Sequence, residues 1–235
     1  MIQNYLEQNK KTFKSWLIDN EPGRVDLKIL PYLKDIDNGF FVEAGALDGL
    51  FMSNTKILED LGWTGLLIEP SHKAVIECRK NRKNLVEECA LVSKDFKDNQ
   101  VLGDFIFDGQ SGTGAWSSIT RGAYGYQTAG RFYAMKIAVP AKTLANIFKE
   151  YEIKKVDFLS LDVEGYELEV LKGIDFNEVD INFILVEINN LEYTLEDIEK
   201  ILMGYKNLGC LSNFSKETNK DWDGSHQDYL FSKYE

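Results

Sequence analysis

The chain has 235 residues, of which 44% are hydrophobic and 28% charged, and these values are typical of one globular domain with a sizeable core. A formal net charge of −11 at pH 7 argues against a duplex nucleic-acid partner and against docking on an anionic membrane, which both need a basic face. The charge leaves open a neutral or cationic small molecule or a glycan, and it also suits a protein that only needs to be soluble.

Cysteine usage and hydropathy indicate a compartment. The three cysteines, Cys78, Cys89 and Cys210, form neither a CxxC pair nor a zinc-ligand spacing. A dispersed, odd set predicts a reducing environment. The first residues lack the apolar core of a signal peptide, and no run approaches the roughly 18 apolar residues that span a bilayer. We therefore expect a cytoplasmic protein.

The N-terminal part shows helical spacing of apolar residues over 2–19, and Pro22, Gly23 and Pro31 break the pattern that follows. We expect residues 1–37 to form a helical extension that leads into the fold.

From residue 39 onward, strand and helix patterns alternate. The expected order is strand 39–43, helix 53–61, strand 64–69, helix 71–82 and strand 85–92. This order implies parallel strands that are joined by right-handed crossovers.

Residues 93–140 interrupt the alternation with short strand patterns and Gly-rich turns, which predicts a β-rich insertion near 101–140. Residues 109–130 contain six glycines, and we interpret this segment as a mobile lid.

The alternation then resumes. The expected elements are helix 143–151, strand 156–162, helix 166–172, strand 182–188 and helix 194–205. Gly173 is expected at the C′ position of the second of these helices. Two further strands, 208–214 and 226–232, have no helix between them and predict an antiparallel hairpin. The whole chain, 1–235, is read as one domain.

The first candidate site is the turn after the first strand, which reads E-A-G-A-L-D-G. Gly45 and Gly49 allow the backbone to approach a ligand, and a helix that begins near Ser53 directs free N–H groups toward it. The second strand ends at Glu69, where an acid can accept hydrogen bonds from both ribose hydroxyls. A glycine turn and a ribose acid together predict an adenosine-type ligand, whereas either alone is compatible with an ordinary βα turn.

The glycine spacing and the acids of this turn favour S-adenosylmethionine over a dinucleotide. A dinucleotide fingerprint would read GxGxxG, and this turn lacks its second glycine. S-Adenosylmethionine carries an ammonium and a sulfonium group, which Glu43 and Asp48 could attract through their charge.

A second group of acids follows the fourth and fifth strands of the main alternation. Asp162, Glu164 and Glu167 end one strand, and Glu187 and Asn189 end the next. An acid that closes a buried strand needs a partner. Three roles stay open: holding the amino group of the cofactor, binding a divalent cation, or accepting a proton from a substrate hydroxyl. Otherwise these acids cap helices and pair with lysines such as Lys172.

Two histidines complete the candidates. If the last strands form a hairpin, His226 begins the antiparallel strand beside the site, where its titration near neutral pH suits a general base. A hydrogen-bonded loop histidine is the competing interpretation. His72 starts a helix near Glu69, and we expect it to pack near the adenosine.

Three segments carry a family resemblance: FVEAGALDGLFMSNT (41–55), WTGLLIEPSHKAVIECRKNR (63–82) and VDFLSLDVEGYELEVLKGI (156–174). Together with FILVEIN (183–189) and HQDYLF (226–231), they resemble the FkbM-type branch of class I S-adenosylmethionine-dependent methyltransferases. The resemblance spans about residues 38–232, and its third segment is the specific one. It implies a Rossmann-like, seven-stranded α/β sheet with an antiparallel last strand, and usually O-methylation of a sugar or natural-product hydroxyl.

The resemblance also implies residue roles. The cofactor-binding residues would be Glu43, Ala44, Gly45, Ala46, Asp48, Ser53, Asn54, Glu69, Pro70, Ala90, Leu91 and Asp162. Among them, Ser53 and Asn54 would lie at the methionine carboxylate, and Ala90 and Leu91 near the adenine. The catalytic candidates are His226, Asp162 and Glu187. No metal ligand is assigned, although Asp162, Glu187 and Asn189 could imitate the cation site of metal-dependent sugar O-methyltransferases.

The leading hypothesis is therefore an S-adenosylmethionine-dependent O-methyltransferase that acts on a carbohydrate hydroxyl. Its alternatives are methylation of an amine, a thiol or a protein side chain, a nucleotide- or glycan-binding module without catalysis, and an NAD-dependent enzyme. The acceptor and the oligomeric state are not specified by the sequence.

Overall fold

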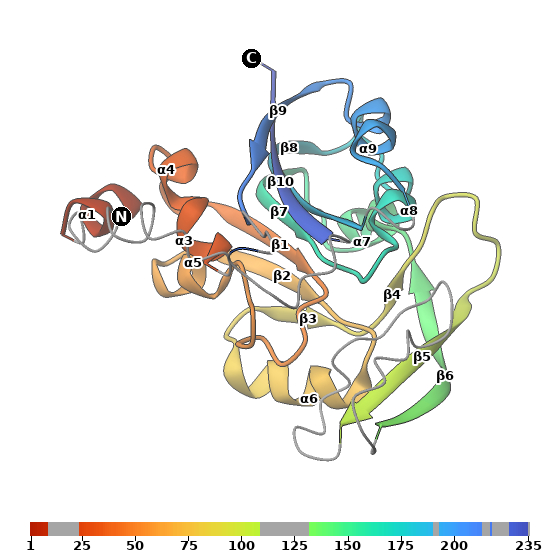
Figure 1. Ribbon diagram of the computed structural model, residues 1–235. Helices are drawn as coiled ribbons and strands as arrows, with labels where there is room; N and C mark the ends of the chain where they lie inside the picture. The colour runs from red at the N-terminus through yellow and green to blue at the C-terminus, as the bar shows by residue number, and fades with distance from the viewer. Residues whose placement is uncertain (9–23, 109–131, 190–192, 213–216, 218–225, 235) are drawn as a thin grey trace.

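The computed structural model describes residues 1–8, 24–108, 132–189, 193–212, 217 and 226–234 (Figure 1). Its centre is a seven-stranded sheet in the order β3-β2-β1-β7-β8-β10-β9. The strands are β1 (Phe40–Ala44), β2 (Thr64–Ile68), β3 (Leu85–Glu87), β7 (Lys155–Leu161), β8 (Asp180–Asn189), β9 (Tyr205–Cys210) and β10 (His226–Lys233). Strand β10 is antiparallel to both neighbours, whereas the pairs from β3 to β8 are parallel. The predicted Rossmann-like sheet is confirmed.

Helices cover both faces of this sheet (Figure 1). One face packs against α7 (Leu144–Glu150), α8 (Glu167–Lys172) and α9 (Leu195–Ile201). The other packs against α1 (Ile2–Gln8), α3 (Val25–Lys28), α4 (Leu30–Leu33), α5 (Lys56–Asp60) and α6 (His72–Asn81). Because both faces are buried, the central strands read as nearly continuous apolar runs in the sequence.

Side chains alternate between the two faces along each strand. Val42 and Leu159 contribute to the first apolar cluster, whereas Phe41 and Phe158 contribute to the second. This alternation also decides where a polar side chain at a strand end points. Odd-numbered positions of β1 therefore direct their side chains to the face that carries α5 and α6.

Helix starts follow the capping residues that the sequence offers, with one shift. Thr143 accepts a hydrogen bond from the backbone N–H of Asn146, and Thr194 forms a capping box with Asp197. Helix α5 begins at Lys56 and not at Ser53. The hydroxyl group of Ser53 donates to the carboxylate of Glu43. The segment before Lys56 is therefore held by Glu43 and is not part of α5.

Gly173 differs from its expected C′ role. It is the C-cap of α8, with a φ of −85°, so the left-handed conformation is not the reason for a glycine there. A Cβ at this position would lie 2.4 Å from the carbonyl oxygen of Val92. The glycine therefore allows α8 to approach a neighbouring backbone segment.

The predicted β-rich insertion is a separate three-stranded sheet in the order β4-β6-β5. It consists of β4 (Ala90–Leu91), β5 (Gln100–Asp108) and β6 (Phe132–Lys142), which lie beside the main sheet (Figure 1). The single strand expected at 85–92 is wrong in this respect, because residues 85–87 pair with β2 and residues 90–91 pair with β6. The proposed lid at 109–130 lies outside the described residues.

The two ends of the domain largely match expectation. The C-terminal hairpin is present as β9 and β10, although β9 covers 205–210 and not 208–214. Helix α9 accordingly ends at Ile201. In the N-terminal extension, α1, α3 and α4 place Ile2, Leu27 and Leu30 in the second apolar cluster.

Across the described ranges, no helix combines the length and the apolar character needed to cross a bilayer.

Candidate active site

The site begins with a row of residues at the carboxyl edge of the sheet. Ala44 pairs with Ile68 on one side and with Leu161 on the other, and Leu161 pairs with Val186. The next position on each strand continues this register, and Asp228 of antiparallel β10 pairs with Glu187. The row therefore reads Glu69, Gly45, Asp162, Glu187 and Asp228. We call it the acidic row, because every member except the glycine carries a carboxyl group.

Gly45 occupies the gap in the acidic row. Its φ is +85°, and a Cβ there would lie 1.7 Å from the carbonyl oxygen of Asp162. At Gly49, with a φ of +80°, a Cβ would lie 2.5 Å from Cγ of Arg82. Both glycines were expected to make room for a ligand. The structure shows that they make room first for other parts of the chain, and that the turn is tightly packed.

Glu69, the predicted ribose acid, is buried with 3% of its surface exposed. One carboxylate oxygen accepts the N–H of Leu47 at 3.0 Å and the other accepts the N–H of Ser71 at 2.8 Å. Burial raises the pKa of Glu69 to about 7, and these hydrogen bonds oppose the shift. Its carboxylate thus links the turn after β1 to the start of α6. Pro70 follows it and is partly exposed.

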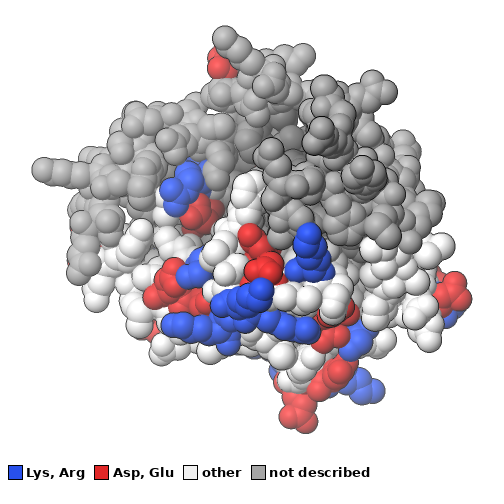
Figure 2. Space-filling model, turned by 90° about the horizontal axis from the view of Figure 1, so that it is seen from below, with Lys and Arg blue, Asp and Glu red and all other residues white. Residues whose placement is uncertain are grey.

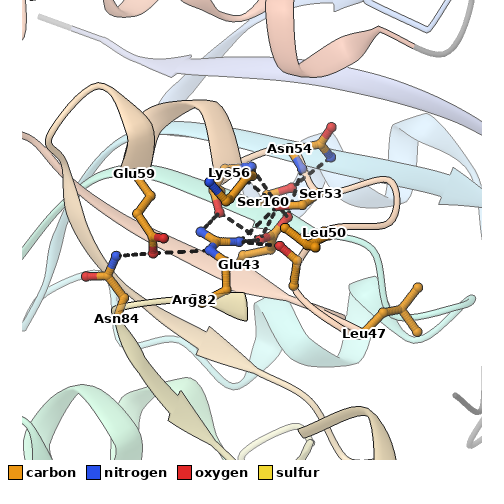
Figure 3. Close-up of polar contacts among 12 residues, drawn as sticks. Glu43, Leu47, Leu50, Ser53, Asn54, Lys56, Glu59, Arg82, Asn84 and Ser160 are labelled. Atoms are coloured by element: carbon orange, nitrogen blue, oxygen red, sulfur yellow. Dashed lines mark hydrogen bonds and ion pairs between the residues drawn. The ribbon is translucent and has the colours of Figure 1, made fainter. Parts of the chain in front are cut away.

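Glu43 has an enclosed environment. Its carboxylate accepts hydrogen bonds from the hydroxyl groups of Ser53 and Thr55, at 2.9 and 2.7 Å, and from the N–H of Asn54 at 2.8 Å. Arg82 adds an ion pair at 3.2 Å. The sequence suggested that Glu43 attracts a cationic ligand and that Ser53 and Asn54 lie at the methionine carboxylate of the cofactor. In the structure Ser53 and Asn54 both donate to the carboxylate of Glu43 (Figure 3).

Asp48, like Glu43, uses its carboxylate to bind groups of the chain itself. Its Oδ1 accepts the N–H groups of Leu50 and Phe51, at 2.9 and 2.8 Å. Ala44 and Ala46 on either side of Gly45 are buried. The side chains of Glu43 and Asp48 therefore stabilise the turn, and the backbone between them is the part of this turn closest to the row.

The centre of the acidic row is a carboxyl pair. Asp162 and Glu187 each have a carboxylate oxygen within 4.8 Å of the other's. Burial raises the pKa of Asp162 to about 6, and burial together with the charges of Asp162 and Glu167 raises that of Glu187. Two buried carboxyl groups this close disfavour being charged at the same time, so this pair is suited to accept or release a proton. Two of the three candidate catalytic residues, Asp162 and Glu187, therefore lie together, and their catalytic role stays a prediction.

Glu167 binds the loop before α8, and it does not cap the helix as the competing interpretation expected. One of its oxygens accepts the N–H groups of Val163 and Gly165, at 2.7 and 3.2 Å, and the other accepts the hydroxyl group of Tyr193. Burial raises its pKa to about 7. Lys172, the suggested partner of these acids, pairs with Glu169 and not with Glu167. Glu167 thus shapes the loop that carries Asp162.

Ligand atoms of Asp162, Glu167 and Glu187 lie within 4.8 Å of one another, close enough to share a cation. Both oxygens of Glu167, however, already accept hydrogen bonds from the chain. A divalent cation therefore stays a prediction from the sequence.

Asp228 was missed in the sequence, and it closes the row opposite Glu187. Burial raises its pKa to about 7, and the charge of Asp162 acts in the same direction. The backbone N–H of Asp228 donates to the hydroxyl oxygen of Ser212 at 2.9 Å, and Lys28 of α3 is the cation whose charge lowers the pKa of Asp228. Lys28 itself is buried and donates to the carbonyl oxygen of Leu211 at 2.8 Å. Once β10 is taken as antiparallel, the pairing of residues 226 and 189 would have placed Asp228 beside Glu187.

The remaining candidates are distributed around the row. His226 begins β10 and pairs with Asn189, two pairs beyond Asp228 and Glu187. Ala90 and Leu91 form β4 and are buried in the smaller sheet. His72 lies on the surface, where Nδ1 contacts Glu88 at 2.7 Å.

Comparisons with known proteins match this chain to methyltransferases. The family profile described as the methyltransferase FkbM domain matches residues 43–210. A curated relative, the methyltransferase sdnD of Sordaria araneosa, is 42% identical over 50 residues, which are 18% of this chain and 19% of that protein. The match therefore spans about a fifth of that relative.

Two solved structures are examples of proteins whose backbone was matched to that of this chain. A TehB-like SAM-dependent methyltransferase from Corynebacterium glutamicum has a TM-score of 0.43 at 7% identity, covering 98% of this chain and 99% of that one. A SAM-dependent methyltransferase from Archaeoglobus fulgidus has a TM-score of 0.43 at 11% identity, covering 95% and 99%.

Proposed function

The chain belongs to the FkbM methyltransferase family, and we propose that it transfers the methyl group of S-adenosylmethionine to a hydroxyl group of a sugar or glycan. The observation that carries this proposal is the acidic row, in which Gly45 separates Glu69 from Asp162, Glu187 and Asp228. The gap divides the edge into a side for the adenosine part and a side for the reacting groups.

The chemistry of the row fits this cofactor. S-Adenosylmethionine carries an ammonium group and a sulfonium group, and burial is the largest cause of the raised pKa values of Asp162 and Glu69. A cationic ligand beside these carboxyl groups would favour their charged forms. The bound cofactor supplies an electrophilic methyl group.

We assign the parts of the cofactor by the same geometry. Glu69 would hold the ribose, Gly45 and Ala46 the methionine part through their backbone, and Asp162 the ammonium group. Ala90 and Leu91 would lie near the adenine. Glu69 supports the first assignment because its carboxylate lies at the end of β2 and is fixed by two N–H groups.

The chain's part in the reaction is to orient the acceptor and to take its proton. The Asp162–Glu187 pair and Asp228 offer carboxyl oxygens with raised pKa values, which suit a proton transfer near neutral pH. His226 is the other candidate base at this end of the sheet. Carboxylate acceptors around the site also match the hydroxyl donors of a sugar.

Charge bears on the acceptor and on the partners. On the face seen in Figure 2, acidic and basic side chains of the described residues lie next to one another. In α6, for instance, Lys80 and Glu77 form an ion pair. This mixture supports a small-molecule or glycan acceptor over a nucleic acid. The row's negative charge specifically favours an amine as the second candidate acceptor. A cytoplasmic location remains part of the proposal, supported by the three free cysteines.

The proposal is tested in two steps. First, S-adenosylhomocysteine should raise the melting temperature, since a ligand at 100 times its dissociation constant adds about 2.7 kcal/mol. A shift with NAD and none with S-adenosylhomocysteine would overturn the cofactor assignment. Asp162→Asn should weaken S-adenosylhomocysteine binding, while Lys80→Met on the surface of α6 serves as the matched control.

Second, transfer of a labelled methyl group is measured on a panel of glycans and amino sugars, with and without divalent cations. Labelling of hydroxyl groups is expected. Labelling confined to amines would replace the hydroxyl proposal with the amine alternative, and cofactor binding without any transfer would favour a binding module.

A further inference from the structure

Arg82, at the C-terminal end of α6, is the hub of the polar cluster around Glu43 (Figure 3). Its side chain is 0% exposed. It forms ion pairs with Glu43 at 3.2 Å and with Glu59 at 3.1 Å, and it donates hydrogen bonds to Ser53 and Thr55. A buried guanidinium with this many oxygen partners has one fixed position, because its donors form a rigid fork.

Arg82 also holds the turn that precedes the site. Its Nη1 donates to the carbonyl oxygen of Gly49 at 3.0 Å, and the neighbouring Asn81 donates to that of Asp48 at 2.9 Å. The Cγ atom of Arg82 occupies the space that a side chain at residue 49 would need. The end of α6 therefore fixes the far end of the turn 45–49 through two adjacent carbonyl groups.

This turn needs such support. Leu47 has a φ of +46°, and Gly45 and Gly49 also have positive φ values. A non-glycine residue in the left-handed region is strained and persists only where its surroundings fix it. The N–H of Leu47, which donates to Glu69, fixes one side, and Arg82 fixes the other.

We propose that Arg82 is a positioning residue for the methionine part of the cofactor, acting through Glu43 and the turn 45–49. The inference rests on the proposed function. In this arrangement Glu43 and Arg82 neutralise each other and preorganise the backbone, which leaves the ammonium group of the cofactor to Asp162. Glu69, which serves the ribose, makes no contact with Arg82 among those the structure describes.

The experiment compares two ligands that differ in the part Arg82 would position. S-Adenosylhomocysteine carries the amino-acid part, whereas 5′-methylthioadenosine shares the adenosine and the thioether without it. Dissociation constants for both are measured by calorimetry with the full chain and with Arg82→Lys, which keeps the charge but loses the planar fork. Loss of charge-assisted hydrogen bonds predicts a dissociation constant for S-adenosylhomocysteine that is raised about tenfold or more. The value for 5′-methylthioadenosine should stay within about twofold.

A merely structural role would give a different result, namely equal loss of both ligands or no loss of either in a folded variant, and either result overturns the inference. The triple variant Glu43→Gln, Glu59→Gln and Arg82→Met, which leaves neither buried carboxylate without its cation, provides the same comparison if Arg82→Lys does not fold. Lys80→Met, on an exposed position of the same helix, is the control and should change neither constant. A wild-type chain that binds neither ligand would instead refute the proposed function.

Discussion

Two groups of carboxyl side chains lie at the same edge of the sheet, and they differ in how their negative charge is compensated. In the Glu43 cluster, Arg82 pairs with two carboxylates that are almost completely buried, Glu43 and Glu59. In the acidic row, Asp162, Glu187 and Asp228 face mainly one another. Only Lys28, which faces Asp228, brings a positive charge near this part of the row among the described residues.

The difference separates a scaffold from a site. A buried acid with an arginine partner and three hydrogen-bond donors has no remaining demand for a ligand. Buried acids that face each other gain from a cation or give up a proton. The same residue type at the ends of neighbouring strands thus has two uses, and partners from distant parts of the chain decide which.

The largest expected effect comes from removing Arg82, the cation of the Glu43 cluster. Arg82→Met leaves Glu43 and Glu59 buried without their cation, so the free energy of unfolding should fall by about 3–5 kcal/mol. Urea denaturation measures it. Adding Glu43→Gln should recover part of the loss, and a double variant no more stable than Arg82→Met alone would show that Glu43 and Arg82 are not coupled.

A second prediction concerns the glycine in the gap of the row. Gly45→Ala combines a φ of +85° with a Cβ 1.7 Å from the carbonyl oxygen of Asp162, so β1 and β7 must separate. We expect a loss of about 3 kcal/mol or more, together with loss of S-adenosylhomocysteine binding.

Gly209→Ala is the control for this change. Its φ is +106°, but no atom lies within 4 Å of the added Cβ, so backbone strain alone should cost roughly 1–2 kcal/mol. Equal losses in the two variants, measured by urea denaturation, would show that the contact with Asp162 has no effect of its own.

The smallest expected effect is a pH dependence in the acidic row. Burial raises the pKa of Asp228 from 3.8 to about 7, so the folded chain binds more protons than the unfolded chain between these values. The stability that this group contributes is therefore complete below about pH 4 and is lost as the pH rises through about 7. The groups that face Asp228 are Lys28, Ser212, Glu187 and Asp162.

Asp228→Asn should flatten this dependence. Between pH 5 and pH 8 the wild type should lose more stability than the variant, which should be more stable at pH 8 by about 1 kcal/mol. Melting temperatures across this range measure the difference, with the exposed Asp35→Asn as control. Parallel curves for the wild type and Asp228→Asn would contradict the assignment.

The sequence alone predicted the sheet, the position of most helices and, except for Asp228, the acids of the carboxyl edge. It succeeded because alternation and capping are local properties: the apolar run 156–161 can only be a buried strand, and Thr194 with Asp197 signals a helix start. It also placed Glu69, Asp162 and Glu187 at one edge, since parallel strands bring their carboxyl ends together.

The tertiary structure decided how those acids are used. No local pattern shows that Arg82, at the end of α6, reaches Glu43 in β1, or that Gly49 is a glycine because Arg82 occupies its side-chain space. Likewise, Asp228 joins the row only through the antiparallel register of β10 against β8. Strand patterns are set by neighbours in the chain, whereas charge compensation depends on residues that only folding brings within a few ångströms.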